Sequence, residues 1–282
     1  MLLGAHVSIS GSIDKAVDRA KGLGCTTFQI FTRNPRGWAA KPLKKKEAEE
    51  FRRKFDEAGF KIAVAHMPYL PNIASPESTT YQKSVRSLIQ ELKRTGALGL
   101  PYLVCHVGSH LGKGLAAGIK RVAGAINKAF LKVDNEVMIL LENMAGQRNS
   151  VGSRFEDIRR ILDLIEDEKR VGICLDTCHA FAAGYDFRTR EAINNTLDDF
   201  DSIIGLEKLK VVHVNDSKGG LGSGIDRHEH IGMGKIGEKG FFELLHHPVI
   251  RPLPLILETP VDSRGNFATN LAKLKALYLG EK

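Results

Sequence analysis

Six apolar segments of this sequence end in a histidine or a carboxylate. The six residues lie at or near the carboxyl end of runs rich in aliphatic and β-branched residues: His66, His106, Glu142, Asp176, His213 and Glu258. Imidazole nitrogens and carboxylate oxygens bind borderline and hard divalent cations. A single histidine or glutamate at such a position is usually a surface or hydrogen-bonded residue. Six in succession predict a metal site.

Two loops add further candidates. His179 follows Asp176 by three residues, and the segment GIDRHEH (224–230) alternates Asp226, His228 and His230. One extended segment can present Asp226 and His228 to the same ion, and His230 remains an alternative. With one of His228 and His230 counted, the loop and strand-end residues give nine donors, which suit two or three ions rather than one tetrahedral ion. Nitrogen and oxygen donors permit zinc, manganese or iron. Cys178 is interpreted as filler beneath the site.

Eight apolar runs alternate with stretches of helical periodicity along the whole chain. The runs are residues 2–7, 26–31, 61–66, 102–107, 137–142, 171–176, 209–214 and 253–258. Helix candidates include residues 13–24, 47–59, 81–99, 154–167 and 270–280. This pattern predicts an α/β fold with a parallel sheet buried on both faces, and eight such units are typical of a single-domain (β/α)8 TIM barrel spanning residues 1–282. A doubly wound open sheet is the alternative, but no glycine-rich phosphate-binding fingerprint follows the first run.

In a barrel, the carboxyl ends of the strands meet at one mouth. Side chains at positions i and i+2 of a strand share a face, so each candidate should lie above a residue that fills the barrel interior. The predicted interior residues are Val64, Val104, Leu140, Cys174, Val211 and Ile256. Cys105 alternates with His106 and is predicted to point outward to the helices. His6 ends the first run and is left without an assigned role.

Composition narrows the class of protein. The 282 residues are 43% hydrophobic and 26% charged, which indicates a globular chain, and no run approaches the roughly 18 apolar residues of a membrane span. The start resembles no signal peptide, and four cysteines without a paired framework predict a reduced, cytoplasmic setting. The net charge of +8 permits a nucleic-acid partner. The basic segments 41–46 and 51–54 are equally explained as a solvated helix face.

Nine short motifs are distributed along the chain: GAHVS (4–8), FTRNPRGW (31–38), HMPYLPN (66–72), CHVGSH (105–110), LENMAGQ (141–147), LDTCHAFAAGYD (175–186), HVNDSKG (213–219), DRHEHIGMGKIG (226–237) and LETP (257–260). Together these motifs resemble the endonuclease IV family of metal-dependent apurinic/apyrimidinic endonucleases. The resemblance runs essentially from end to end. Val107 departs from it, since many members have proline there.

The resemblance implies a barrel that holds three Zn2+ ions per chain, with Mn2+ or Fe2+ able to replace one. His66, His106 and Glu142 would hold one ion, and Glu142 would bridge to a second ion completed by Asp176, His213 and Glu258. His179, Asp226 and His228 would hold the third, and only the resemblance selects His228 over His230. Glu142 and Glu258 are the implied catalytic carboxylates.

The implied activity is base-excision repair of double-stranded DNA. The enzyme would hydrolyse the phosphodiester 5′ to an abasic site, leaving a 3′-hydroxyl and a 5′-deoxyribose phosphate, and would clear blocked 3′ ends as a repair diesterase. Arg36, Tyr69 and Leu70 match residues that enter the duplex. A monomer acting in the cytoplasm on the nucleoid is expected, with no membrane partner. The alternatives are a barrel sugar isomerase or epimerase and a basic nucleic-acid binder without catalysis.

Overall fold

Eight parallel strands form the central sheet of the computed structural model, which describes residues 1–39 and 41–280. In sequence order they are β1 (Leu2–Ala5), β2 (Gln29–Phe31), β3 (Val64–His66), β4 (Tyr102–His106), β5 (Met138–Glu142), β6 (Val171–Asp176), β7 (Leu209–His213) and β10 (Pro254–Leu257). Each coincides with one of the eight predicted runs, shortened at one or both ends in all but one case.

The sheet closes on itself. Its strand order is β1-β10-β7-β6-β5-β4-β3-β2. At the seam between β1 and β2, His6 and Gln29 form a parallel bridge, and the backbone N–H of Val7 donates to the carbonyl of Gln29 at 2.8 Å. Because neighbours in the sheet follow the order of the chain, the open doubly wound alternative is wrong and the predicted (β/α)8 barrel is confirmed.

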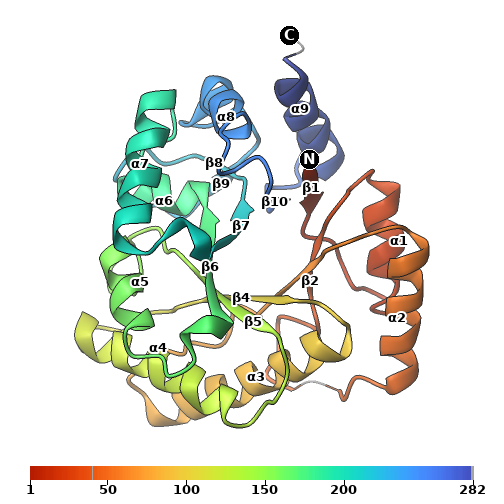
Figure 1. Cartoon of the computed structure of the whole chain (residues 1–282), viewed down its shortest axis with the longest axis vertical. Coiled ribbons are helices and arrows are strands. Elements are labelled where there is room, and N and C mark those ends of the chain that lie inside the picture. Colours follow the sequence, from red (N-terminus) through yellow and green to blue (C-terminus); the bar gives the residue numbers. More distant parts are fainter. Residues whose placement is uncertain (40, 281–282) are drawn as a thin grey trace.

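Helices surround the strands as an outer ring (Figure 1). They are α1 (Lys15–Gly22), α2 (Lys45–Glu57), α3 (Ser78–Ala97), α4 (Leu115–Phe130), α5 (Phe155–Leu162), α6 (Thr177–Ala183), α7 (Arg190–Ile203), α8 (Gly237–Leu245) and α9 (Phe267–Leu279), with short 3-10 turns η1 (Glu168–Arg170) and η2 (Leu206–Lys208). Gly59 and Gly99 end α2 and α3 with φ of +79° and +73°, a conformation that glycine adopts without strain. Within the described residues, no helix combines the length and apolarity that crossing a membrane requires.

The strand residues divide between two hydrophobic layers. The six predicted interior residues Val64, Val104, Leu140, Cys174, Val211 and Ile256 are fully buried and pack together inside the barrel. Residues that alternate with them, such as Leu103 and Cys105, belong to the larger core between strands and helices. The predicted alternation is therefore confirmed, including the outward direction of Cys105. The polar residues at the mouth of the barrel lie directly above this interior layer.

Candidate metal centre at the mouth of the barrel

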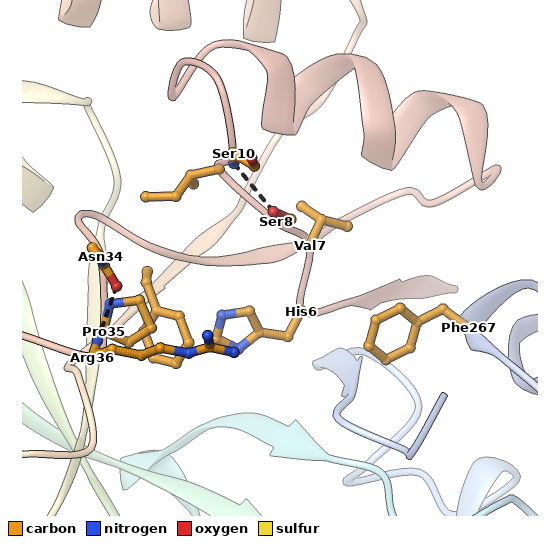
Figure 2. A pocket seen from close by; sticks show the side chains of 10 residues that line it. His6, Val7, Ser8, Ser10, Asn34, Pro35, Arg36 and Phe267 are labelled. Atoms are coloured by element: carbon orange, nitrogen blue, oxygen red, sulfur yellow. Dashed lines mark hydrogen bonds between the residues drawn. The ribbon is translucent and has the colours of Figure 1, made fainter. Parts of the chain in front are cut away.

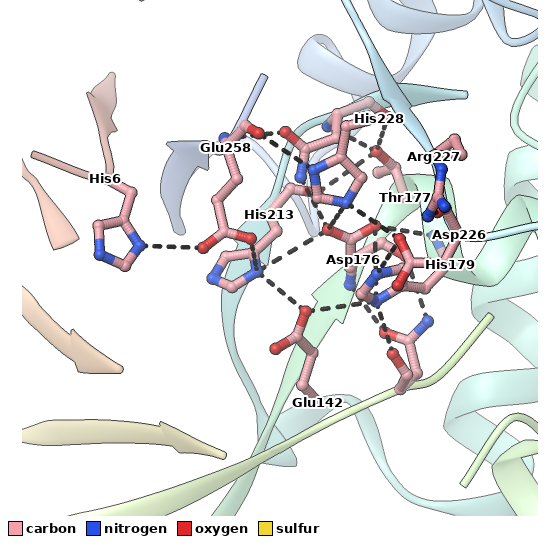
Figure 3. A network of polar contacts seen from close by, with 12 residues as sticks. His6, Glu142, Asp176, Thr177, His179, His213, Asp226, Arg227, His228 and Glu258 are labelled. Atoms are coloured by element: carbon pink, nitrogen blue, oxygen red, sulfur yellow. Dashed lines mark hydrogen bonds and ion pairs between the residues drawn. The ribbon is translucent and has the colours of Figure 1, made fainter. Parts of the chain in front are cut away.

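The six strand-end candidates lie together at the carboxyl end of the barrel. Figure 3 shows four of them, Glu142, Asp176, His213 and Glu258. His66, His106, Glu142, Asp176 and His213 are the last residues of their strands, and Glu258 follows the last residue of β10. Each candidate stands two residues beyond an interior side chain, so the alternation of the strand turns it into the barrel axis. The candidate residues form four groups of three or four side chains. Within each group, the donor atoms all lie within 4.8 Å of one another.

The first group joins β3, β4 and β5. His66 Nε2 and His106 Nε2 lie 3.1 Å and 3.0 Å from the same oxygen, Oε2 of Glu142. Glu142 and His66 are buried, and His106 is partly exposed. Two imidazoles and one carboxylate oxygen therefore converge on a single point.

The second group uses the other oxygen of the same carboxylate. His213 Nδ1 lies 3.2 Å from Glu142 Oε1, 3.3 Å from Glu258 Oε2 and 3.8 Å from Asp176 Oδ2. Three carboxylates thus surround one imidazole nitrogen. Because Glu142 turns Oε2 to the first group and Oε1 to the second, it connects the two.

The third group joins the β6–α6 turn to the long loop after β7. Asp176 caps α6 by accepting the backbone N–H of His179 at 2.8 Å, and this N-cap sets His179 in the first turn of the helix. His179 Nε2 lies 3.2 Å from Asp226 Oδ1, and His228 Nε2 lies 3.9 Å from the same oxygen. His228 Nε2 also lies 3.6 Å from Asp176 Oδ2, which connects the third group to the second.

Cys178 lies close to this third group. Its sulfur forms a further donor set with Asp176 and His228. Burial raises the pKa of the Cys178 thiol to about 12, which disfavours the thiolate that binds metal. The geometry admits Cys178 as a donor, while the chemistry of the buried thiol favours the predicted packing role.

Four of the imidazoles turn one nitrogen to a carbonyl oxygen and the other toward carboxylates. The contacts to carbonyl oxygens are His66 Nδ1 to Met67 (2.6 Å), His179 Nδ1 to Asn143 (3.0 Å), His228 Nδ1 to Glu258 (3.1 Å) and His213 Nε2 to the side chain of Gln29 (2.9 Å). A carbonyl oxygen can only accept, so the nitrogen facing it carries the proton and the opposite lone pair faces the carboxylates. Lone pairs and carboxylates converge favourably only around a cation. This is the usual surrounding of metal-bound histidine, and the donor set fits divalent ions.

The electrostatics agree with a cation site. Burial alone would raise the pKa of Glu142, but His106 and His213, when protonated in place of a bound cation, hold it well below its ordinary value through their positive charge. Burial likewise opposes protonation of His179, yet the charge of Asp176 and the hydrogen bond to Asp226 raise its pKa. His228 Nε2 is buried without a hydrogen-bond partner among the described residues. The centre therefore keeps Glu142 ionised and presents an unpaired nitrogen on His228.

Three side-chain amides that the sequence analysis does not identify form hydrogen bonds to the proposed ligands. Asn215 Nδ2 donates to Asp176 Oδ2 at 2.7 Å, while its oxygen accepts the backbone N–H of Glu258. Asn143 accepts the backbone N–H of Asp176 at 2.7 Å. Gln29 contacts both Glu258 and His213. Asn143 and Asn215 directly follow or nearly follow predicted ligands in sequence, which is the only sequence signal that could have found them.

His6 and His230, whose roles the sequence does not assign, lie in different surroundings. His230 turns away from the donor groups, with Nε2 3.0 Å from Asp262 Oδ1 and Nδ1 2.9 Å from Asn270 Nδ2. His6 Nδ1 lies 3.1 Å from Glu258 Oε1, at the edge of the second group. The structure therefore brings His228 rather than His230 into the centre, and places His6 beside a proposed ligand.

The loop that carries Asp226 and His228 is held by one buried carboxylate. Within it, β8 (Asp216–Ser217) and β9 (His228–Glu229) form an antiparallel pair. Asp216 accepts five backbone N–H groups, from Ser217, Gly232, Gly234, Ile236 and Gly237, at 2.8–3.3 Å. Asp216 thereby folds the glycine-rich segment back on itself and sets β9 over the mouth.

The three predicted DNA-contacting residues lie on loops at the same end. Tyr69 and Leu70 are 63% and 42% exposed, and the Tyr69 ring centroid lies 6.1 Å from that of His106. Arg36 is exposed and lines a pocket of about 760 Å³ together with His6, Asn34 and Phe267 (Figure 2). The preceding Arg33 is buried and donates to Glu91 on α3 at 2.6 Å, which anchors the loop that bears Arg36. All three residues are free to meet a ligand at the mouth.

Nearly the whole chain is similar to a known family and to named proteins. A family model described as a xylose isomerase-like TIM barrel matches residues 17–277. A protein named probable endonuclease 4 from Methanoculleus marisnigri is 55% identical over 98% of this chain and 99% of its own length. A probable endonuclease 4 from Nitrosopumilus maritimus is 50% identical, with the same coverage of both chains.

Solved structures also superpose on nearly the whole chain. The endonuclease IV of Thermus thermophilus superposes with a TM-score of 0.89 at 38% identity, covering 99% of this chain and 100% of the other. A D-tagatose 3-epimerase-like protein superposes with a TM-score of 0.74 at 19% identity, covering 99% of this chain and 97% of the other, a likeness that shows the fold alone.

Proposed function

The chain belongs to the endonuclease IV family, and from this we propose that it is a metal-dependent nuclease that hydrolyses the phosphodiester 5′ to an abasic site in duplex DNA. The observation that carries the proposal is the convergence of nine imidazole and carboxylate side chains, linked through Glu142, beside the exposed Tyr69 and Leu70. The products would be a 3′-hydroxyl and a 5′-deoxyribose phosphate. Removal of blocking groups from 3′ ends would use the same centre.

The proposed ligands fall into three groups. His66, His106 and Glu142 would hold one ion; Glu142, Asp176, His213 and Glu258 a second; His179, Asp226 and His228 a third. We propose Zn2+ because the resemblance to the endonuclease IV family implies it, with Mn2+ or Fe2+ able to replace one ion. Nitrogen and oxygen donors permit all three metals. Divalent ions bound at such sites activate water near neutral pH and neutralise charge on a phosphate.

The residues of the chain prepare the site for that chemistry. Glu142 fixes the spacing of the first two groups, because its two oxygens face His106 and His213. The carbonyl contacts of the imidazoles hold their lone pairs toward the reacting region without rearrangement. Glu258 stands at the edge of the second group nearest His6, where it would orient the scissile phosphate or the attacking water. Such preorganised electrostatics are commonly the largest contribution to catalysis.

Substrate selection would come from the loops around the centre. A missing base leaves a gap in the stack and lowers the cost of extruding the nucleotide. Tyr69 and Leu70 have the amphipathic and apolar character of side chains that enter a base stack and kink DNA. Arg36 would enter the duplex beside them, and the net charge of +8 would neutralise phosphates. Lesion recognition would thus be separate from the residues that cut.

A nicking assay tests the proposal. Metal-loaded protein is incubated with a duplex that bears one tetrahydrofuran abasic analogue, and the products are resolved by denaturing electrophoresis. We expect one nick 5′ to the analogue with an extendable 3′-hydroxyl, and no nick in the matched intact duplex. Absence of nicking together with epimerisation of a free ketose would favour the sugar-epimerase alternative. A duplex with a 3′-phosphoglycolate end tests the diesterase activity in the same assay.

A further inference from the structure

Gln29 is a fully buried amide that touches two proposed ligands of the second group at once. Its Nε2 donates to Glu258 Oε1 at 2.7 Å, and its Oε1 lies 2.9 Å from His213 Nε2. Both polar atoms of the Gln29 amide are therefore engaged by these ligands. Gln29 thus lies behind the ligands, where it can act only through them.

The polarity of the amide fixes the state of both partners. Because Oε1 accepts, His213 must carry its proton on Nε2, which leaves the lone pair of Nδ1 facing Glu142 and Glu258. Because Nε2 donates, Glu258 is held by Oε1 and turns Oε2 toward His213. The reversed amide would place two oxygens in contact at Glu258 and a donor opposite His213 Nε2. Only one orientation makes both contacts favourable.

The backbone of Gln29 holds this amide in place. Its bridge to His6 and its bond from the Val7 N–H form the seam that closes the barrel between β1 and β2. His6 adds a side-chain contact, with Nδ1 3.0 Å from Gln29 Nε2, and its ring packs on Phe31 with centroids 4.2 Å apart. The side chain that orients the ligands is thus fixed at the closure of the sheet.

We propose that Gln29 is a positioning residue that sets the tautomer of His213 and the rotamer of Glu258, and thereby the affinity of the second group for its ion; this assignment rests on the metal-binding role proposed above. Removal of a residue that orients a ligand in this way weakens metal binding or activity by about 10–100-fold. The effect should fall on one ion of the set.

Two substitutions test the contacts of Gln29 with Glu258 and His213. Gln29→Met keeps the length of the side chain and removes both the donor and the acceptor. Gln29→Glu keeps an acceptor for His213 but sets a carboxylate against Glu258. Thr27→Val is the matched control, because Thr27 is buried on the same segment and its hydroxyl donates to the carbonyl of Ile62 at 2.9 Å, away from the donors.

The measurement is metal per chain, by elemental analysis after dialysis against graded chelator. We expect both Gln29 variants to lose one ion at about 10–100-fold lower chelator than wild type, with the remaining ions retained. Thr27→Val should match wild type. In cleavage assays kcat should fall while KM for the abasic duplex stays unchanged. Equal loss of every ion, or retention equal to that of Thr27→Val, would overturn the assignment.

A second measurement needs no substitution. Long-range 1H–15N spectra of the imidazoles in the zinc-loaded wild type should show His213 protonated at Nε2, and a proton on Nδ1 would overturn the assignment even if the variants did not fold. Failure of the proposed function has a different signature, since wild type would then bind no metal. Full metal content with unaffected Gln29 variants would refute the positioning role alone.

Discussion

Glu258 reaches His213 across two neighbouring strands, with 3.3 Å between Oε2 and Nδ1. The register of the sheet explains the contact, because Ile256 pairs with His213 and Glu258 follows two residues later on the same face. The same register sets Glu258 above the interior residue Ile256. A carboxylate held in this way has its direction fixed by the backbone.

Glu258→Ala should therefore abolish cleavage without abolishing DNA binding. Loss of one carboxylate from the second group should lower kcat by at least about 100-fold, while the Kd for a duplex with an abasic analogue stays close to wild type. Glu243→Gln serves as the control, since Glu243 pairs with Arg190 on the outer helices. A variant that retains wild-type kcat would exclude Glu258 from the reaction.

Removal of the metal ions should lower the stability of the protein as well as abolish DNA cleavage. Glu142 and Asp176 are completely buried, and bound ions would compensate their charge. A ligand at 100 times its Kd stabilises a protein by about 2.7 kcal/mol, so chelation should lower Tm by roughly 5 °C or more per ion lost. Calorimetry before and after chelation checks this, with added zinc as the reversal. An unchanged Tm would contradict a buried metal centre.

Tyr69→Ala should reduce discrimination between abasic and intact DNA. Stacking of an aromatic side chain on a base contributes about 1–3 kcal/mol, so the ratio of the two Kd values should fall by about tenfold or more. Metal content should not change. Leu131→Ala is the matched control, because Leu131 is 76% exposed but follows α4 at the opposite end of the barrel. Equal ratios in the two variants would remove Tyr69 from lesion recognition.

Arg36→Ala should change the salt dependence of DNA binding. A plot of log K against log salt concentration should lose about one unit of slope if Arg36 contacts a phosphate. Arg53→Ala provides the comparison, since Arg53 is exposed on α2 and pairs with Glu50 and Glu57. Parallel plots for wild type and the Arg36 variant would show that Arg36 contacts no phosphate.

Asp216→Asn should loosen the loop that carries His228. The asparagine amide keeps one acceptor oxygen and adds a donor where five backbone N–H groups converge, so the free energy of unfolding should fall by about 1–3 kcal/mol. Hydrogen exchange of residues 232–237 should accelerate selectively. Asp199→Asn, on the exposed face of α7, should leave both quantities unchanged. Uniform acceleration across the barrel would argue against a local role.

The sequence was sufficient for the barrel and its polar mouth, for a physical reason. Strand period and chain order determine where strand ends meet, so Asp176 above Cys174 follows from alternation alone. The role of Gln29 could not be predicted, because it depends on the offset between distant strands and an amide has no distinctive pattern. The same holds for the choice between His228 and His230, which share one face of an extended segment until Asp262 and Asn270 draw His230 aside.

The position of β10 has a consequence for biosynthesis. It is the last strand of the barrel in sequence, yet it lies between β7 and β1, and it delivers Glu258. A nascent chain that has emerged only as far as β7 would still lack Glu258 and the strand that closes the barrel between β7 and β1. Pairing at such long sequence separation forms late in folding. The competence to cut DNA would thus arise only after β10 and Glu258 have been synthesised.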